Sequence, residues 1–161
     1  MSPRILTIGA YGYTPEAFFS ALEEAGADLF LDVRQRRGLR GSQYAFANAG
    51  QLTSELKDRG LAYRYERDLA PDSEIRRVQH DADIAAGITK TRRTELAPLF
   101  VEAYTARRLE TFDWGRLTTE LAHRDAPVVF CVERRPESCH RSLVAARLAR
   151  LLDRAVVNLT A

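Results

Sequence analysis

The sequence predicts a single α/β domain, folded as three layers around a mostly parallel five-stranded sheet. Short apolar, β-branched runs alternate with segments of helical periodicity at both ends of the chain, which is the pattern of strand–helix–strand units. Glycine or proline marks most of the boundaries between these segments. The 161 residues contain no internal repeat, low-complexity tract or linker, so residues 1–161 are expected to form one domain.

The first part of the chain supplies three strands and two helices. Strands are expected at residues 4–8, 29–33 and 61–65, and helices at residues 15–25 and 51–59. Thr14 and Pro15 are a helix cap and a proline at the first helical position, while Gly26 and Gly60 are helix stops. Residues 34–47 are expected to be an irregular, basic loop.

The strand pattern disappears between about residues 66 and 124, which predicts a helical insertion between the third and fourth strands. Its helices are expected at about residues 73–86, after Asp72 or Ser73 as cap, and at 91–108 and 113–123. The insertion is either a lid or a packing layer, and the sequence favours a packing layer. A strand at residues 127–132, a helix at 142–152 and a last strand at 155–159 follow.

The composition excludes several functional classes. With 45% apolar and 29% charged residues, the chain resembles an ordinary soluble globular protein. No apolar run approaches the length that spans a membrane, and the N-terminus lacks a signal-peptide pattern, so a cytoplasmic protein without a membrane partner is expected. The net charge of +2 does not by itself indicate nucleic-acid binding. Two cysteines without a secretory context argue against a disulfide framework.

Reactive side chains gather in residues 131–141, between the fourth strand and the last helix. Sites in open α/β sheets form at the carboxyl ends of strands, where this turn is expected. Cys139 is placed at the start of the helix, where a thiol tends to have a lowered pKa, and is the predicted nucleophile, activated by His140. Glu133 is the predicted general acid or base, and Cys131 completes the catalytic candidates.

A second cluster follows the second strand and should meet the first. Asp32 and Arg34 lie at its carboxyl end, and Arg40 belongs to a loop that holds four arginines in residues 34–40. Guanidinium groups interleaved with aromatic residues suit phosphates and stacked bases. Together with Arg141 and with Tyr11, in the turn after the first strand, these residues are the predicted substrate-binding set. The pocket is expected to be lined by Asp32, Arg34, Arg40, Cys131, Glu133, Cys139, His140 and Arg141.

Other interpretations of the same residues remain open. Cys131 is equally consistent with a packed strand residue, and Glu133 with an ion pair to Arg34 or Arg141 that joins two loops. A zinc or iron site would use Cys131, Glu133, Cys139 and His140. The sequence does not favour a metal, because close Cys-x-x-Cys pairs are lacking and the adjacent Cys139 and His140 would point about 100° apart on a helix. A Cys131–Cys139 disulfide across the turn would be redox-regulated.

These motifs resemble those of the domain-of-unknown-function 488 family. The matching residues are Thr7-Ile8-Gly9, Asp32-Val33-Arg34, Gly60-Leu61-x-Tyr63, Cys131-Val132-Glu133 and Cys139-His140-Arg141. Three positions differ from the family pattern: Ala10-Tyr11 stands in place of His-Ser, Gln35-Arg36-Arg37 follows Asp-Val-Arg where a proline is common, and Leu69-Ala70 stands where Leu-Gly is expected after the third strand. The resemblance implies a fold and a site but not an established reaction.

The function expected from the sequence is therefore that of a small enzyme acting on an anionic substrate, such as a nucleotide, nucleic acid or other phosphorylated molecule. A nucleophilic cysteine is compatible with a hydrolase or a transferase. The alternative is a non-catalytic module that binds nucleic acid, or binds or senses a metal, with the same residues.

Overall fold

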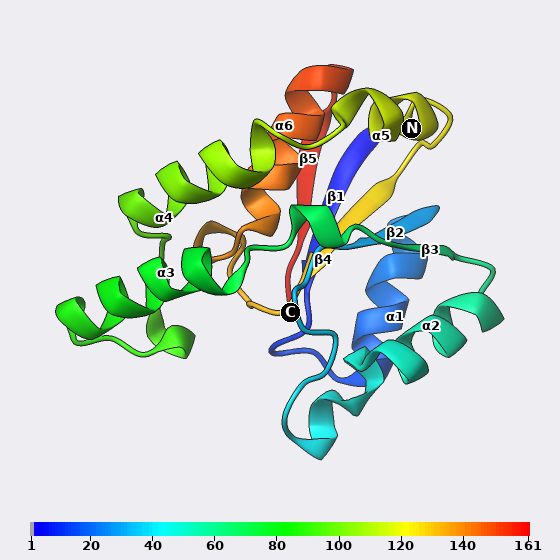
Figure 1. Cartoon of the computed structure of the whole chain (residues 1–161). Coiled ribbons are helices and arrows are strands. Elements are labelled where there is room, and N and C mark those ends of the chain that lie inside the picture. The colour runs from blue at the N-terminus through cyan, green and yellow to red at the C-terminus, as the bar shows by residue number, and fades with distance from the viewer. Residues whose placement is uncertain (1) are drawn as a thin grey trace.

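The computed structural model describes residues 2–161 and has one parallel five-stranded sheet at its centre (Figure 1). The strand order is β3-β2-β4-β1-β5, and every neighbouring pair is parallel. The strands are β1 (Arg4–Gly9), β2 (Leu29–Asp32), β3 (Ala62–Tyr65), β4 (Pro127–Cys131) and β5 (Ala155–Leu159). The predicted α/β class is confirmed, and the sheet is wholly parallel.

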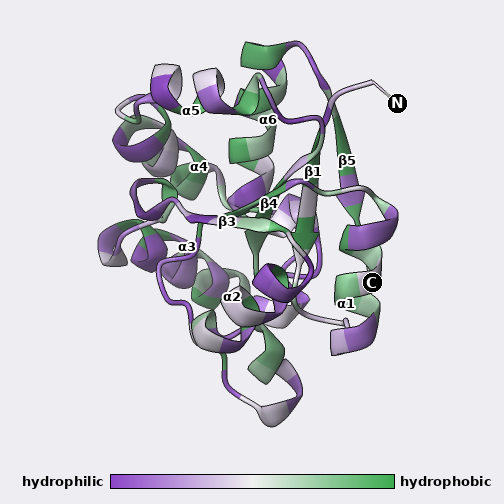
Figure 2. Cartoon of the chain, turned by 90° about the vertical axis from the view of Figure 1, so that its right-hand side faces the viewer, coloured by the Kyte–Doolittle hydropathy of each residue, from purple (hydrophilic) through white to green (hydrophobic). Residues whose placement is uncertain are grey.

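Helices cover both faces of the sheet and give the three predicted layers. One face packs against α1 (Pro15–Glu24) and α2 (Ala49–Asp58), around a core that includes Phe18 and Phe130. The other face packs against the remaining helices, around Tyr104 and Leu148. These helices are α3 (Ser73–Ala86), α4 (Pro98–Tyr104), α5 (Trp114–Leu121) and α6 (Arg141–Leu152). Figure 2 shows apolar residues concentrated in the strands and on the inward sides of the helices.

Local signals in the sequence set several helix ends as expected. The Thr14 hydroxyl accepts a hydrogen bond from the Ala17 N–H and caps α1, and Asp72 caps α3 through the Ile75 N–H. Gly87, with φ of 68°, ends α3 in the left-handed conformation that glycine adopts without strain. The capping residues therefore decided these boundaries locally.

The helical insertion is present between β3 and β4, but one of its predicted helices is wrong. The expected helix at residues 91–108 begins only at Pro98, and a 3₁₀ turn occupies Lys90–Arg92. Proline disfavours a helical conformation in the residue before it, and Ala97 is extended, with ψ of 141°. After α4 the backbone widens into one π-helical turn at Thr105–Leu109. In Figure 1, α3 and α4 extend sideways from the sheet.

Two loop predictions also need correction. The loop expected to be irregular contains a 3₁₀ helix at Ser42–Ala47 that buries Phe46 in the core. Cys139 was expected at the cap or in the first turn of the last helix, but it precedes the cap residue His140 and is extended, with φ of −133° and ψ of 141°. A 3₁₀ turn at Pro136–Ser138 comes before it. The cysteine is therefore not part of the helix.

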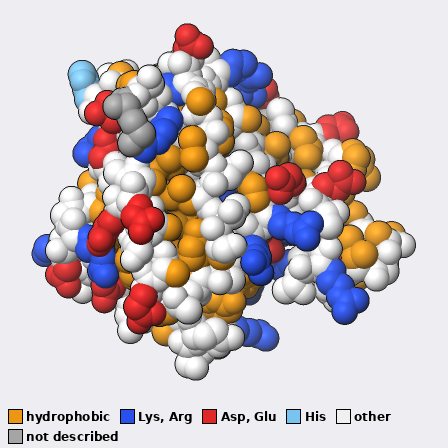
Figure 3. Space-filling view, turned by 180° about the vertical axis from the view of Figure 1, so that it is seen from behind, with side chains coloured by type: hydrophobic (Ala, Val, Ile, Leu, Met, Phe, Trp, Pro, Cys, Tyr) orange, Lys and Arg blue, Asp and Glu red, His pale blue; other side chains and the backbone are white. Residues whose placement is uncertain are grey.

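The sheet register brings the candidate motifs to one edge. Gly9 pairs with Cys131, and Asp32 pairs with Phe130, so β1, β2 and β4 end at nearly the same level. The edge strand β5 lies on the side of the molecule seen in Figure 3, and its Val156 and Val157 side chains are 38% and 40% exposed. No helix within the described residues is long and apolar enough to cross a membrane.

Candidate functional site

A pocket of about 410 Å³ opens at the carboxyl ends of β2 and β4. Its buried part is lined by side chains from the β4–α6 turn, including Cys131, Glu133, Cys139 and His140. Its outer part is lined by the loop after β2 and by the helical insertion. The position agrees with the rule that parallel sheets place their sites at the carboxyl ends of strands.

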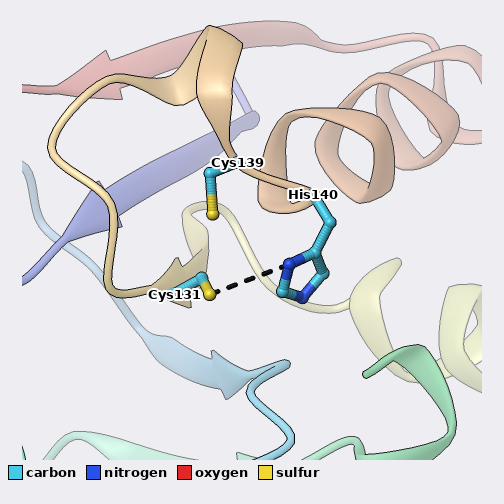
Figure 4. A group of neighbouring side chains, drawn as sticks. All are labelled: Cys131, Cys139 and His140. Atoms are coloured by element: carbon cyan, nitrogen blue, oxygen red, sulfur yellow. Dashed lines mark hydrogen bonds between the residues drawn. The ribbon is translucent and has the colours of Figure 1, made fainter. Parts of the chain in front are cut away.

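Two cysteines and a histidine converge at the buried end of this pocket. Figure 4 shows both sulfur atoms and the imidazole ring directed toward one another. The Cys131 Sγ atom lies 3.8 Å from His140 Nδ1, and one donor atom from each of Cys131, Cys139 and His140 lies within 4.8 Å of the other two. Both cysteines are free thiols, so the disulfide that the turn would allow is not formed.

The extended conformation of Cys139 explains this convergence. Two adjacent helical residues would point about 100° apart, which was the geometric objection to a joint site. Because Cys139 precedes the helix and is extended, its side chain and that of His140 both reach Cys131. The objection therefore does not apply to this turn.

The His140 ring is oriented by a hydrogen bond on its far side. Its Nε2 atom lies 2.8 Å from the Val33 carbonyl oxygen at the end of β2. A carbonyl oxygen only accepts, so Nε2 carries a proton and donates it to Val33, while Nδ1 faces the Cys131 sulfur. The Tyr104 ring packs edge-on against the imidazole at 5.5 Å, and its hydroxyl donates to the Leu69 carbonyl oxygen. The insertion thus holds the ring in place.

The two thiols ionise differently. Burial opposes the ionisation of Cys139, but hydrogen bonds with Cys131 and His140 and the charge of Arg141 outweigh it and hold the pKa of Cys139 well below its usual range. The hydrogen bond to Cys139, together with burial, raises the pKa of Cys131 well above its usual range. Cys139 therefore loses its proton more readily than Cys131.

Glu133 lies beside this cluster and is only 5% exposed. Its expected ion pair with Arg34 or Arg141 is not formed. Lys90 of the insertion lies 3.1 Å from its Oε1 atom instead, without a well-directed hydrogen bond. Burial raises the pKa of Glu133, and Lys90 only partly opposes that shift. A buried carboxyl group with one exposed cationic neighbour therefore lines the pocket next to Cys139.

Asp32 and Arg34 form a buried ion pair at the end of β2. Arg34 donates from Nε and Nη2 to the two carboxylate oxygens of Asp32, at 2.9 and 2.8 Å, and from Nη1 to the Ala47 carbonyl oxygen at 2.8 Å. The Tyr63 hydroxyl also donates to Asp32 at 2.7 Å. Arg34 reaches the pocket wall but its donors are directed at protein atoms, and Asp32 does not line the pocket.

Arg141 is fully buried and lies outside the pocket lining. Its guanidinium donates to the backbone carbonyl oxygens of Glu133 and Arg134 and thereby holds the loop after β4. Gly9 makes the same arrangement possible, because a Cβ atom there would lie 1.9 Å from the Glu133 carbonyl oxygen and 3.0 Å from Arg141 Nη1. The glycine of the opening motif is therefore required by the approach of the Glu133 backbone.

The structure places two further predicted binding residues away from the pocket lining. Arg40 is exposed. Tyr11 packs against Tyr44 with ring centroids 5.0 Å apart, and its N–H donates to the Val132 carbonyl oxygen at 3.0 Å. Burial raises the pKa of Tyr11, and the charges of Lys90 and Glu133 also act on it. Tyr11 therefore lies near the site without lining the pocket.

Several pocket residues come from the insertion and were not identified from the sequence. Arg93 donates to Asp83 at 2.7 Å and to the Ser138 carbonyl oxygen at 3.1 Å, which fastens the insertion to the site turn. The other pocket residues from α3 and the turn after it include Arg76, Arg77, Gln79, His80 and Lys90. The charge pattern of α3 is that of an ordinary solvent-exposed helix, so only its position in the fold identifies it as part of the pocket.

A model described as "Domain of unknown function DUF488" matches residues 14–148. This span is most of the chain. The chain belongs to the DUF488 family. No curated protein and no solved structure matched it in the corresponding comparisons.

The match places both halves of the site within the DUF488 domain. The span includes Asp32 and Arg34 after β2 and the whole turn from Cys131 to Arg141. It also includes the insertion that forms the outer wall of the pocket. Gly9 lies before the matched span, although it packs against the Glu133 backbone within it.

Proposed function

We propose that this DUF488 protein is an enzyme that acts on a small anionic substrate, such as a nucleotide or another phosphorylated molecule. The observation that carries the proposal is one pocket with a buried thiol–imidazole–carboxylate group at one end and cationic side chains on its outer wall. Reactive groups together with a binding surface for charge are what a polar substrate of this class needs.

The charge of the outer wall supports an anionic substrate. Lys90 is paired with Glu133, Arg93 with Asp83 and Arg34 with Asp32. Arg36, Arg76 and Arg77 also line the pocket, and within residues 2–161 none of these three takes part in an ion pair. Guanidinium groups bind phosphate through charge-assisted hydrogen bonds. Arg36 and Arg77 therefore remain available to a ligand, and Arg76, which donates from Nη1 to the Gln35 side-chain oxygen at 2.8 Å, has further donors for one.

The size of the pocket favours a small molecule over a polymer. Its volume of about 410 Å³ lies within the range of small-molecule sites. Tyr44 and Phe46, the aromatic residues of the arginine-rich loop after β2, are engaged elsewhere, since Phe46 is buried in the core and Tyr44 packs on Tyr11. A nucleic acid would reach the buried cluster only through one nucleotide inserted into the pocket.

Each part of the site then has a chemical role. The reacting atoms of the substrate would lie at Cys131, Cys139 and His140, and the Glu133 carboxyl group would transfer a proton as general acid or base. Arg36, Arg76 and Arg77 would bind the anionic part of the substrate. Arg34, paired with Asp32, holds the loop after β2 through the Ala47 carbonyl oxygen. Arg141 holds the loop after β4 through the Glu133 carbonyl oxygen.

Binding can be measured with pyrophosphate and AMP as probes, by isothermal titration calorimetry at low salt. The Arg36→Gln/Arg76→Gln variant should bind at least about tenfold more weakly, because one charge-assisted hydrogen bond contributes about 1.5 kcal/mol or more. Arg150→Gln, an exposed arginine on α6 outside the pocket, is the matched control and should bind like the wild type. Equal affinities in all three proteins would refute the anion site.

Turnover is tested on a panel of nucleotides and sugar phosphates analysed by mass spectrometry. For any substrate that the wild type converts, Glu133→Gln should lose at least about a hundredfold in rate, the usual contribution of general acid–base catalysis. Tight, steeply salt-dependent binding of oligonucleotides without any turnover would instead support the non-catalytic alternative.

A further inference from the structure

We propose that Cys131, Cys139 and His140 bind one zinc ion, with its fourth coordination position open to the pocket. Two thiolates and one imidazole are zinc ligands, and three protein ligands with one open position are typical of catalytic rather than structural zinc sites. The binding of the ion does not depend on the proposed function. Its use in catalysis rests on that function.

The spacing of the donor atoms fits a tetrahedral ion. Zinc–sulfur bonds of about 2.3 Å and zinc–nitrogen bonds of about 2.0 Å put neighbouring ligand atoms about 3.5–3.8 Å apart. Cys131 Sγ and His140 Nδ1 are 3.8 Å apart, and no pair among the three donors exceeds 4.8 Å. Each side chain therefore needs to move by only about 1 Å or less to bind the ion.

The outer contacts of the histidine are those of a metal ligand. Metal-binding histidines nearly always donate their other ring N–H to a carbonyl or carboxylate oxygen, which fixes the tautomer. The Nε2 atom of His140 is bound in this way to the Val33 carbonyl oxygen, and Nδ1 faces the thiols. Tyr104 packs against the ring and restricts its rotation. The imidazole is thus held in the orientation for metal binding.

The burial of Cys139 favours a ligand over a nucleophile that attacks directly. Its side chain is only 2% exposed, and its sulfur lies within 4.8 Å of Cys131 Sγ and of a ring nitrogen of His140. A substrate atom would have to displace those neighbours to reach the sulfur, whereas an ion among the three donors contacts all of them at once. Metal binding and direct attack by Cys139, the reaction expected from the sequence, exclude each other.

A water molecule in the open position would become acidic because the ion stabilises hydroxide. One O–H bond of that water would break, its proton would move to the Glu133 carboxylate, and hydroxide would stay on the ion as the nucleophile. Glu133 lines the same pocket as Cys139, and its buried Oε1 atom has Lys90 Nζ at 3.1 Å as a charged neighbour. A carboxylate in this position is suited to accept the proton.

Zinc stoichiometry tests the site. Full-length protein purified without chelator is incubated with excess ZnSO₄ and dialysed, and zinc is measured by mass spectrometry. The wild type should retain one equivalent. Cys131→Ser, Cys139→Ser and His140→Gln should each lose more than about a hundredfold in affinity, since even the outer contacts of ligands contribute 10–100-fold. His80→Gln replaces the other histidine of the pocket and is the matched control.

The cobalt spectrum of the wild type keeps the test decisive even if a variant fails to fold. Titration with Co²⁺ should give sulfur-to-metal charge-transfer bands and intense visible bands of a tetrahedral ion, saturating at one equivalent. Wild-type protein that retains no zinc, a cobalt spectrum without sulfur bands, or full affinity in folded Cys139→Ser would each overturn the site.

The outcomes distinguish the zinc site from the proposed enzymatic function. Stoichiometric zinc in a protein that converts no member of the substrate panel would leave the metal site standing and refute the enzyme. Turnover by protein shown to be free of metal would support the enzyme and refute the zinc site as its reaction centre. Turnover that is lost with the metal and restored by added zinc supports both.

Discussion

Removal of the Arg34 side-chain charge should destabilise the fold strongly, because this arginine is structural. Arg34 is 2% exposed and Asp32 is fully buried, and Arg34→Met would leave the Asp32 carboxylate with only Tyr63 and one backbone N–H as partners. Breaking a buried ion pair by removing one partner costs about 3–5 kcal/mol. The three side-chain hydrogen bonds of Arg34, at about 1.5 kcal/mol each, give a similar figure.

The assay is urea denaturation followed by far-UV circular dichroism and by the fluorescence of Trp114, the single tryptophan. A loss of about 3–5 kcal/mol corresponds to a fall in Tm of roughly 6–20 °C for a domain of this size. Arg40→Met is the matched control, because Arg40 is exposed in the same loop and its replacement should change stability by less than about 0.5 kcal/mol.

A double-mutant cycle identifies the pair itself. Asp32→Asn combined with Arg34→Met should cost less than the two single changes together, since each single change already breaks the same interaction. A loss below about 1 kcal/mol in Arg34→Met would refute the structural role. The Arg34 guanidinium would then count among the groups available to bind substrate.

Three further predictions follow from single contacts. Gly9→Ala should cost at least about 1–3 kcal/mol in urea unfolding, because its Cβ would lie 1.9 Å from the Glu133 carbonyl oxygen and the loop must move; wild-type stability would contradict this. Burial and Asp32 raise the pKa of Tyr63 to about 12, so its stabilising contribution is complete below pH 10 and is lost toward pH 12. The unfolding free energy of Tyr63→Phe, measured at several pH values, should therefore fall less steeply over that range, and parallel curves would argue against it. Arg93→Met should speed hydrogen exchange in α3 and the turn after it, since Arg93 ties them to the site turn, and unchanged exchange would exclude that role.

Local sequence signals predicted the secondary structure where each signal acts over a few residues. The caps at Thr14 and Asp72 and the left-handed Gly87 set helix ends through contacts within one turn. The helix expected at residues 91–108 begins only at Pro98. Apolar residues keep their helical spacing on both sides of this proline, but the residue before a proline is disfavoured in the helical conformation. Periodicity reports which face is buried and does not by itself locate the first helical residue.

The candidate site was only partly predictable. The Cys-x-Glu and Cys-His-Arg motifs identified the reactive turn, since strand, turn and helix follow one another in sequence. The roles of the arginines were not predictable, because burial decides them: Arg141 and Arg34 direct their donors at buried protein atoms, while Arg76 of the insertion lines the pocket and gives one hydrogen bond to Gln35. A guanidinium has the same chemistry in all three places, and only the surrounding chain determines its partner.

The sequence alone determined the class of fold, the strands and most of the helices, and the concentration of thiol, imidazole and carboxyl groups in the turn after β4. The tertiary structure decided the strand order, the extended backbone that lets Cys139 and His140 meet Cys131, and the pairing of Lys90 with Glu133. The physical reason is the separation along the chain over which each interaction acts. Propensities and caps act between residues close in sequence, whereas burial and ion pairing depend on neighbours that only the packed chain brings together.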